Sequence, residues 1–309
     1  MRRGSERGAA LLLVVLLISL LAVLVVEFQR EARLKLRSAG NLRDALQAHA
    51  LLRSGVAVGS VLLLADAEES AVDHRGELWN APIPPVPLGD GSLSVGVEDL
   101  DGKFPLGSLV DGAGKAVPAQ VAAYRRLLSA LELESADPAD LADALVAWID
   151  EDQDGPFETH PDLTVPNAPL EHLEELARVE GYTPEVLRSL LPHVDVRADR
   201  AINVNTATVP VLLSLHDALL RSDVEDLYEE LGESHVERIA DLRTHAAFAG
   251  IANFPALAQN LKVESTRFRM YLSADVPAAA LSPVIRQARA VLQRDRTKKE
   301  VLLVDWIEE

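Results

Sequence analysis

The sequence predicts an α+β fold in which one long N-terminal helix packs on a small antiparallel sheet and a large all-α domain is inserted into the sheet region. An uncharged apolar run, Ala9–Val26, passes without a break into a charged segment of strong helix formers. Apolar and polar residues alternate at 91–99 and again at 267–273, as in strands with one buried face. Between these segments, nearly every stretch from 118 to 258 has helical periodicity. We therefore expect the helical block to interrupt one sheet, with its two ends close together.

The apolar run is long enough to cross a membrane. As a helix rising about 1.5 Å per residue it would span about 27 Å, close to the hydrocarbon thickness of a bilayer, about 30 Å. Residues 1–8 before it are net basic, and by the positive-inside rule they keep the N-terminus in the cytoplasm. No small-x-small cleavage site of a secretory signal follows the run. The bulk of the chain is therefore expected on the far side of the membrane.

A basic leader ending in Gly8, followed by an apolar helix that continues as an amphipathic one, resembles the N-terminus of type IV pilins. The resemblance implies cleavage of the leader between Gly8 and Ala9, which makes residues 9–26 a transmembrane and assembly helix. A simple signal anchor is the alternative.

One position departs from the pilin pattern. Pilins of the filament body usually carry Glu at the fifth mature position, where this chain has Leu13. A carboxylate in hydrocarbon costs about 2.5–3.5 kcal/mol unless it meets a partner charge, and leucine cannot make that pairing. Within the resemblance, Leu13 indicates a minor subunit, and in one family the subunit at the filament tip.

Residues 27–65 are expected to continue the long helix, because apolar positions from Phe28 onward recur at spacings of three and four. The pattern leaves open an interruption near Gly55 and Gly59. Residues 66–114 are expected to form the pilin-like β part, with a Pro-rich spacer, the strand at 91–99 and a tight turn in which Gly102 supplies positive φ.

The inserted all-α domain is expected at 115–262, followed by returning strands of the sheet at 263–309. Helices are predicted near 121–131, 139–149, 169–179, 183–191, 209–220, 224–231, 234–245 and 255–260. Basic residues cluster in the last segment and predict a solvated hairpin rather than a binding patch; they are Arg286, Arg289, Arg294, Arg296, Lys298 and Lys299.

The composition excludes several classes of function. With 48 acidic and 30 basic residues, the formal net charge is −18, and such a surface repels phosphate backbones. The chain has no cysteine, so disulfides, thiolate metal sites and cysteine nucleophiles are excluded. Neither an HExxH spacing nor a Gly-x-Ser-x-Gly elbow occurs, and we predict no catalytic residue.

The sharpest local motif is an acidic loop after the second helix of the block. Asp150, Asp152 and Asp154 precede a glycine, as in the first half of an EF-hand loop, whose oxygens converge on a hard cation. The twelfth position is Pro161 rather than a bidentate glutamate, although Glu158 at position 9 or Asp162 at position 13 could serve instead. Because carboxylates this close repel one another, we expect calcium on Asp150, Asp152, Asp154 and Glu158, with a solvated acidic loop as the alternative.

The segment Asn203–Ala207 resembles the opening of helix-hairpin-helix DNA-binding modules. The Gly-rich hairpin that binds phosphate in those modules is replaced here by residues 215–218, which contain no glycine. We therefore expect Asn205 or Thr206 to cap a helix instead, and no nucleic acid to be bound.

Taken in order, these features resemble the K-type minor pseudopilins of type II secretion systems, over nearly the whole chain. The segments that carry the resemblance are Arg7–Leu12, Arg53–Gly55, Trp79, Asp99–Leu106, Leu145–Asp150, Asn203–Ala207 and Phe268–Ser273. The family's long loop with paired tyrosines after the acidic motif is missing from 159–169.

The resemblance implies a non-enzymatic subunit of the bacterial inner membrane, with a cytoplasmic N-terminus and a periplasmic bulk. Such a subunit caps the periplasmic pseudopilus and supports its assembly and protein export. Implied partners are the prepilin peptidase and other minor pseudopilins, met through the helix that carries Leu13 and Phe28; contact with secreted substrates is left open.

Two other classes of protein fit parts of the pattern. A membrane-anchored calcium-dependent binding module would keep the acidic loop and need neither leader cleavage nor partner pseudopilins. A helix-hairpin-helix DNA receptor would bind DNA with a steep salt dependence.

Overall fold

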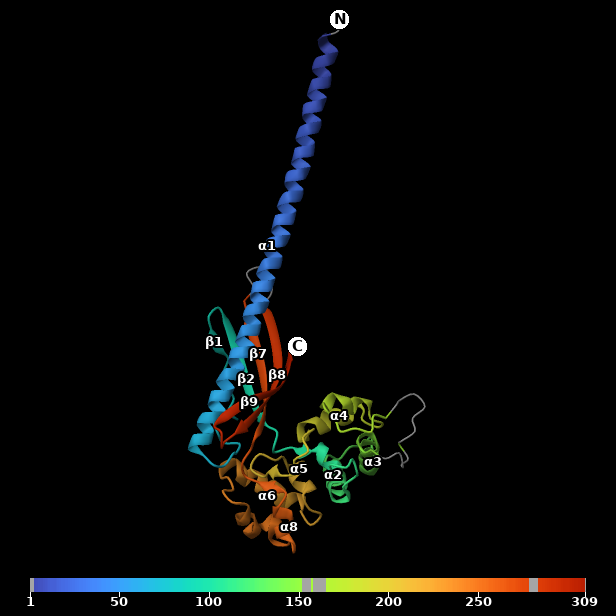
Figure 1. Cartoon of the computed structure of the whole chain (residues 1–309), viewed down its shortest axis with the longest axis vertical. Helices are drawn as coiled ribbons and strands as arrows, with labels where there is room; N and C mark the ends of the chain where they lie inside the picture. Colours follow the sequence, from blue (N-terminus) through green and yellow to red (C-terminus); the bar gives the residue numbers. More distant parts are fainter. Residues whose placement is uncertain (1–2, 152–156, 158–164, 278–282, 309) are drawn as a thin grey trace.

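A computed structural model of the chain describes residues 3–151, 157, 165–277 and 283–308, and side chains from residue 10 onward. A single long helix is followed by the first strands of a sheet, a block of short helices and three long strands (Figure 1). The predicted α+β fold is confirmed. The helices are α1 (Arg3–Glu69), α2 (Pro118–Ala130), α3 (Pro138–Ile149), α4 (Pro184–Leu190), α5 (Val209–Ser214), α6 (Arg221–Glu233), α7 (Ala246–Ala249) and α8 (Phe254–Ala258). The strands are β1 (Val86–Leu88), β2 (Gly91–Asp99), β3 (Phe104–Pro105), β4 (Val194–Asp195), β5 (Ile202–Asn203), β6 (Leu261–Lys262), β7 (Arg267–Val276), β8 (Val284–Asp295) and β9 (Glu300–Glu308).

Helix α1 is continuous through both glycines at which an interruption was left open. Each glycine lies where the helix meets the sheet. A Cβ on Gly55 would lie 2.7 Å from Leu272 Cδ2, and a Cβ on Gly59 would overlap the side chain of Met270. The two glycines therefore allow a close approach of helix and sheet rather than a break in the helix.

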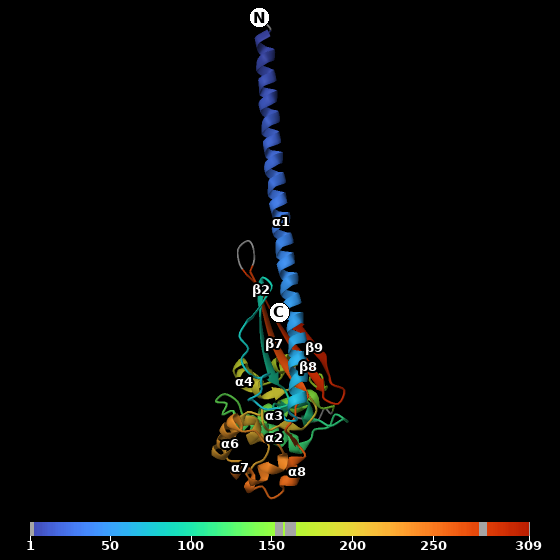
Figure 2. The same cartoon turned by 90° about the vertical axis from the view of Figure 1, so that its left-hand side faces the viewer.

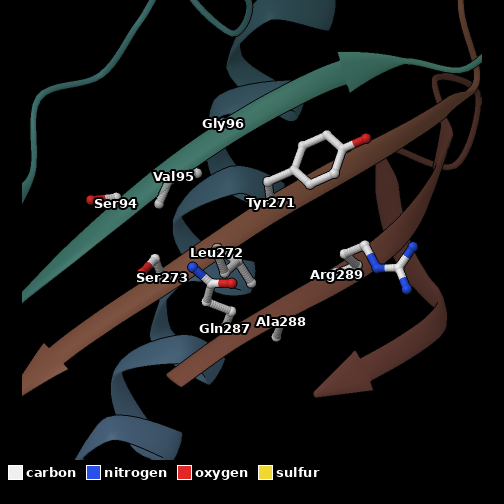
Figure 3. A pocket seen from close by; sticks show the side chains of 9 residues that line it. All are labelled: Ser94, Val95, Gly96, Tyr271, Leu272, Ser273, Gln287, Ala288 and Arg289. Atoms are coloured by element: carbon white, nitrogen blue, oxygen red, sulfur yellow. The ribbon is translucent and has the colours of Figure 1, made fainter. Parts of the chain in front are cut away.

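The main sheet is antiparallel, with strand order β1-β2-β7-β8-β9. Helix α1 runs along one face of the sheet (Figure 2), and strand residues alternate between this covered face and an outer face, as the close-up in Figure 3 shows. Side chains such as Val95, Leu272 and Ala288 point toward α1, whereas Tyr271 and Arg289 point away from it. The core between helix and sheet consists of Ala48, Leu51, Leu52, Leu63, Trp79, Leu93, Val95, Val97, Phe268, Met270, Leu272, Ala274, Val276, Ala288, Ala290 and Leu292.

The helical block enters and leaves the sheet at one point. Strands β2 and β7 are direct neighbours, and their pairing ends at Asp99 opposite Phe268. One residue further, the Leu100 N–H donates to the Arg267 carbonyl at 3.0 Å. The block between them has its own apolar core and lies at the end of the sheet farthest from the N-terminus of α1 (Figure 1). The sequence-based expectation of an insertion into the sheet is thus met.

The block contains less α-helix than the periodicity predicts. The segments 169–179 and 234–245 form only short 3₁₀ helices, Leu173–Arg178 and Ile239–Thr244, and the helix predicted at 209–220 ends at Ser214. Two short parallel strand pairs, β3 with β4 and β5 with β6, were not predicted. One cause is visible at Asn205, whose side-chain amide exchanges hydrogen bonds of 3.0 and 2.9 Å with the backbone of Val236. This long-range contact keeps the segment before Ile239 from joining the helix predicted at 234–245.

Gly102 does not have the positive φ that was predicted; among the described glycines, that conformation occurs at Gly89, Gly114 and Gly181. A Cβ on Gly102 would lie 2.8 Å from the backbone carbonyl carbon of Thr206. The glycine is needed there for the close approach of two chain segments.

Candidate functional site

The first candidate surface is the exposed part of α1, defined here as residues 10–43. Every residue in it is exposed except Ala32 and Gly40, which are half-buried. Its most apolar stretch has a mean hydropathy of 3.1 and none of it is buried within the chain. Leu13 is 65% exposed and Phe28 73%. An apolar surface of this length needs a cover, either a membrane or other polypeptides.

The docked part of α1, residues 44–69, ends in a buried ion-pair network. The Arg294 side chain is fully buried and donates to the Leu63 carbonyl at 3.1 Å, to Asp66 Oδ2 at 2.9 Å and to Asp73. Its guanidinium also lies 4.7 Å from the centre of the Phe268 ring. The predicted solvated hairpin is therefore wrong for this arginine. The end of α1, at Leu63 and Asp66, and the segment after it, at Asp73, supply carbonyl and carboxylate acceptors that sequence patterns do not connect to Arg294.

Three carboxylates meet in this network. The oxygens of Asp66, Asp73 and Glu77 lie within 4.8 Å of one another, the one such acidic group found among the described residues. Burial, followed by the charges of Glu77 and Asp73, raises the pKa of Asp66 to about 6. Arg294 and Arg296 donate to these carboxylates, with 2.8 Å from Arg296 Nη2 to Asp73 Oδ2. Because Arg294 and Arg296 pair with two of these carboxylates, the cluster ties the C-terminal end of α1 to the end of β8.

A second buried network lies where the block joins the sheet. Asp99 accepts hydrogen bonds from Ser265 Oγ at 2.6 Å, Thr206 Oγ1 at 2.5 Å and Asn203 Nδ2 at 3.2 Å. Burial and then the neighbouring charge of Asp101 raise the pKa of Asp99 to about 6. The middle of the inserted block, at Asn203 and Thr206, and the segment that follows the block, at Ser265, are thus both tied to the last residue of β2.

Arg197 completes this junction. Its side chain is almost fully buried, and its guanidinium donates to the carbonyls of Leu100, Asp101 and Lys103 at 3.2, 3.0 and 2.8 Å. Asp101 in turn pairs with Lys262 at 2.8 Å. Because every donor here has its acceptor, the junction holds the block in one orientation on the sheet.

The structure corrects the role predicted for Asn205 and Thr206. The N-cap of α5 is Thr208, which makes no side-chain capping bond. Asn203 and Asn205 are fully buried and bond within the chain. Both asparagines of the segment that resembles a DNA-binding motif are therefore used in contacts within the chain.

The structure describes only one of the predicted calcium ligands. Asp150 follows α3 as its C-cap, in an extended conformation, and is 5% exposed. Asp152, Asp154 and Glu158 lie outside the described residues. The predicted cleavage pair, Gly8 and Ala9, lies within α1, but the description of side chains begins after it.

A cleft of about 920 Å³ separates the outer face of the sheet from the block. Two ion pairs link its walls, Arg269 to Asp195 at 3.2 Å and Arg289 to Glu174 at 2.9 Å. Tyr271 and Arg289 also border a shallower hollow on the same face, seen in Figure 3. These ion pairs add to the junction in fixing the block.

These features define a pilin-like protein, with an uncovered membrane-length helix, an antiparallel sheet docked on its second part and a bulky inserted domain. Residues 102–199 match the family model described as Type II secretion system (T2SS), protein K. The type II secretion system protein K of Pseudomonas aeruginosa is 30% identical over 272 residues, covering 82% of this chain and 77% of that protein. The chain belongs to the type II secretion system protein K family, a family of minor pseudopilins.

Two further proteins also match over most of the chain. The type II secretion system protein K of Aeromonas hydrophila is 28% identical over 303 residues, covering 88% of this chain and 89% of that protein. A crystal structure of the GspK-GspI-GspJ complex from the enterotoxigenic Escherichia coli type 2 secretion system contains a chain of the same fold. The TM-score is 0.72 at 19% identity, covering 87% of this chain and 98% of that chain.

Proposed function

We propose that this chain is the minor pseudopilin at the tip of the periplasmic pseudopilus of a type II secretion system. It is held in the inner membrane by one span, with its N-terminus in the cytoplasm and its bulk in the periplasm. It supports initiation and assembly of the pseudopilus and thereby protein export. Its partners in this role are the prepilin peptidase and other minor pseudopilins; the related chain in the Escherichia coli crystal structure is seen with GspI and GspJ.

The position of the inserted block carries the tip assignment. It lies beyond the sheet, at the end of the molecule opposite the N-terminus of α1 (Figure 1). In a filament whose subunits stack with α1 along the axis, the next subunit would need the space that the block fills. Leu13 supports the same assignment, because it cannot supply the carboxylate that filament-body pilins carry at this position.

The leader gives a direct test. Intact mass spectrometry of the full chain extracted from membranes should show an N-terminus at Ala9 when the prepilin peptidase is present and at Met1 when it is absent. Gly8→Glu should abolish the processing, and Gly4→Glu, in the same leader, should leave it intact. An unprocessed chain in the presence of the peptidase would contradict the proposal.

Assembly gives the second test. In detergent extracts of cells that express all minor pseudopilins of the system, the partners should co-purify with the full chain. Phe28→Glu places a charge on the exposed part of α1 and should lower the yield of partners at least tenfold. Leu78→Glu is the control, because Leu78 is equally exposed, at 70%, but lies outside that helix. Equal yields from both variants would argue against assembly through α1.

Calcium is a second element of the proposal. Asp150 offers an oxygen ligand of the kind that calcium prefers, at the start of a loop that continues with Asp152, Asp154 and Glu158. The expected result is a rise in the thermal unfolding midpoint of the full chain with calcium over chelator. Asp150→Asn should remove this rise and Glu151→Gln should keep it. A midpoint insensitive to calcium would leave the acidic loop as a solvated surface loop.

A further inference from the structure

The two edges of the main sheet differ in how they are protected. Strand β1, at one edge, has only three residues, and one of them is Pro87, which has no N–H to offer. Pro84 and Pro85 come directly before it. Short, proline-bearing edges are a known way of preventing another strand from pairing. The β1 edge is thus closed.

Strand β9, at the other edge, is open. It has nine residues and contains neither proline nor glycine. Among the described residues it pairs with β8 alone. Leu302, Leu303 and Val304 are 52%, 39% and 51% exposed. A long edge strand with exposed aliphatic residues and unpaired backbone groups is a template for a further strand.

The second half of β9 is fixed against α1. Arg53 lies over the Trp306 ring, 4.6 Å from its centre, and His49 pairs with Glu308 at 2.7 Å. The strand is therefore already held in an extended conformation. A partner strand would not need to order it, which lowers the entropic cost of pairing.

The charge of β9 indicates what kind of strand fits. Glu300, Asp305 and Glu308 are its only charged residues, and all are acidic. A second copy paired antiparallel about Val304 would place Glu300 opposite Glu308 at both ends, and like charges directly opposite each other are destabilising. The complementary partner carries basic residues among apolar ones.

We propose that β9 pairs through its open edge with an extended segment of another minor pseudopilin that carries basic residues among apolar ones. This inference rests on the proposed function, since it names a second contact in the same assembly. The first contact is made by the exposed part of α1, and the second would set the rotation of neighbouring subunits about that helix.

Photo-crosslinking of the full chain in membranes tests this contact. The probe is p-benzoyl-phenylalanine, placed in separate proteins at Leu302 on β9, at Val86 on β1 and at Leu34 on α1, with the other minor pseudopilins of the system co-expressed. We expect adducts with a pseudopilin from Leu302 and from Leu34, and at least tenfold less from Val86. Mass spectrometry of the Leu302 adduct should place it in an extended, basic segment of the partner.

A charge variant sharpens the test. Asp305→Lys should lower the Leu302 adduct about tenfold and leave the Leu34 adduct unchanged, with an unchanged denaturation midpoint as the control for folding. Three outcomes overturn the inference alone: a Leu34 adduct without a Leu302 adduct, a Leu302 adduct to a second copy, or one to a helical segment. Loss of both adducts overturns the proposed function and this inference with it.

Discussion

The two parts of α1 belong to one helix but are stabilised differently. In the docked part, Ala48, Leu52 and Leu63 are fully buried against the sheet, and two glycines bring the backbone close to it. In the first half of the exposed part, residues 10–26, apolar residues cover all sides of the helix and the chain buries none of them. A helix that is apolar all round is suited to lipid or to the interior of an assembly. The docked part therefore stabilises the folded sheet region, and the exposed part is the surface to which the proposed function assigns assembly.

The largest effect is expected at the buried end of the docked part. Arg294→Ala leaves Asp66 and Asp73 without their shared partner, and breaking a buried pair from one side costs about 3–5 kcal/mol in the free energy of unfolding. The matched change in the exposed part is Lys35→Ala, which removes a solvent-exposed pair with Glu31 and should cost less than about 0.5 kcal/mol.

Denaturant unfolding of the full chain in detergent measures both variants. If Arg294→Ala lowered the free energy of unfolding as little as Lys35→Ala does, the buried network would not anchor α1. The division of the helix into two parts would then lose its physical basis.

Apolar truncation is the second comparison. Leu52 is fully buried, and Leu52→Ala should cost about 2–5 kcal/mol in the free energy of unfolding through lost burial and the cavity left behind. Leu21 is 53% exposed, and Leu21→Ala should change it by less than about 0.5 kcal/mol. In the co-purification assay we expect the reverse order, a larger loss of partners for Leu21→Ala than for Leu52→Ala, because Leu21 lies on the proposed assembly surface. A loss of partners with Leu52→Ala in a folded protein would contradict this division.

Periodicity and composition predicted the elements that repeat a pattern over many residues. The long helix, the strand at 91–99 and the interruption of the sheet follow from such patterns. The junctions do not, because their residues are far apart in sequence: Arg294 meets Asp66 and Asp73, and Arg197 meets three carbonyls next to Asp99. The sequence did single out 99–106 and 203–207, but as a turn and a cap.

The roles of the glycines also depend on contacts that are far apart in sequence. Positive φ was expected at Gly102, whereas Gly55, Gly59 and Gly102 are all required by the proximity of another segment. A single sequence shows that a glycine is present but not what lies against it. Long-range hydrogen bonds such as that of Asn205 to Val236 shorten predicted helices for the same reason.

Glycine substitutions give the third comparison. Gly59→Leu would overlap Met270 in a filled core, and overpacking costs about 1–3 kcal/mol in the free energy of unfolding. Gly40 has open space where its Cβ would lie, so Gly40→Leu should stabilise the helix by up to about 1 kcal/mol through helix propensity alone. The test is whether the two substitutions change the free energy of unfolding in opposite directions, measured again by denaturant unfolding in detergent. If both substitutions stabilise, the helix does not approach the sheet as closely as the structure indicates.

The smallest effect expected is the pH dependence that arises from Asp66 in the docked part. Asp66 has a pKa of about 6 in the folded chain against 3.8 as an isolated side chain, with burial as the main cause. The folded state therefore binds the carboxyl proton of Asp66 more tightly than the unfolded state does. The contribution of protonated Asp66 to stability is largest below pH 3.8 and is lost as the pH rises through about 6.

Asp99, whose pKa is also raised to about 6, acts in the same direction, and His74 and His193, whose pKa values are lowered by burial, act in the opposite direction. The test therefore uses a difference between two proteins that share these three groups. The unfolding free energy of the wild-type chain minus that of Asp66→Asn should be larger at pH 5.5 than at pH 7.5. The lower value stays above the sequence pI of about 4.9, where the chain still carries net charge. If this difference in unfolding free energy did not change with pH, Asp66 would be as well solvated as a carboxylate on the exposed part. The docked part of α1 would then end before Asp66.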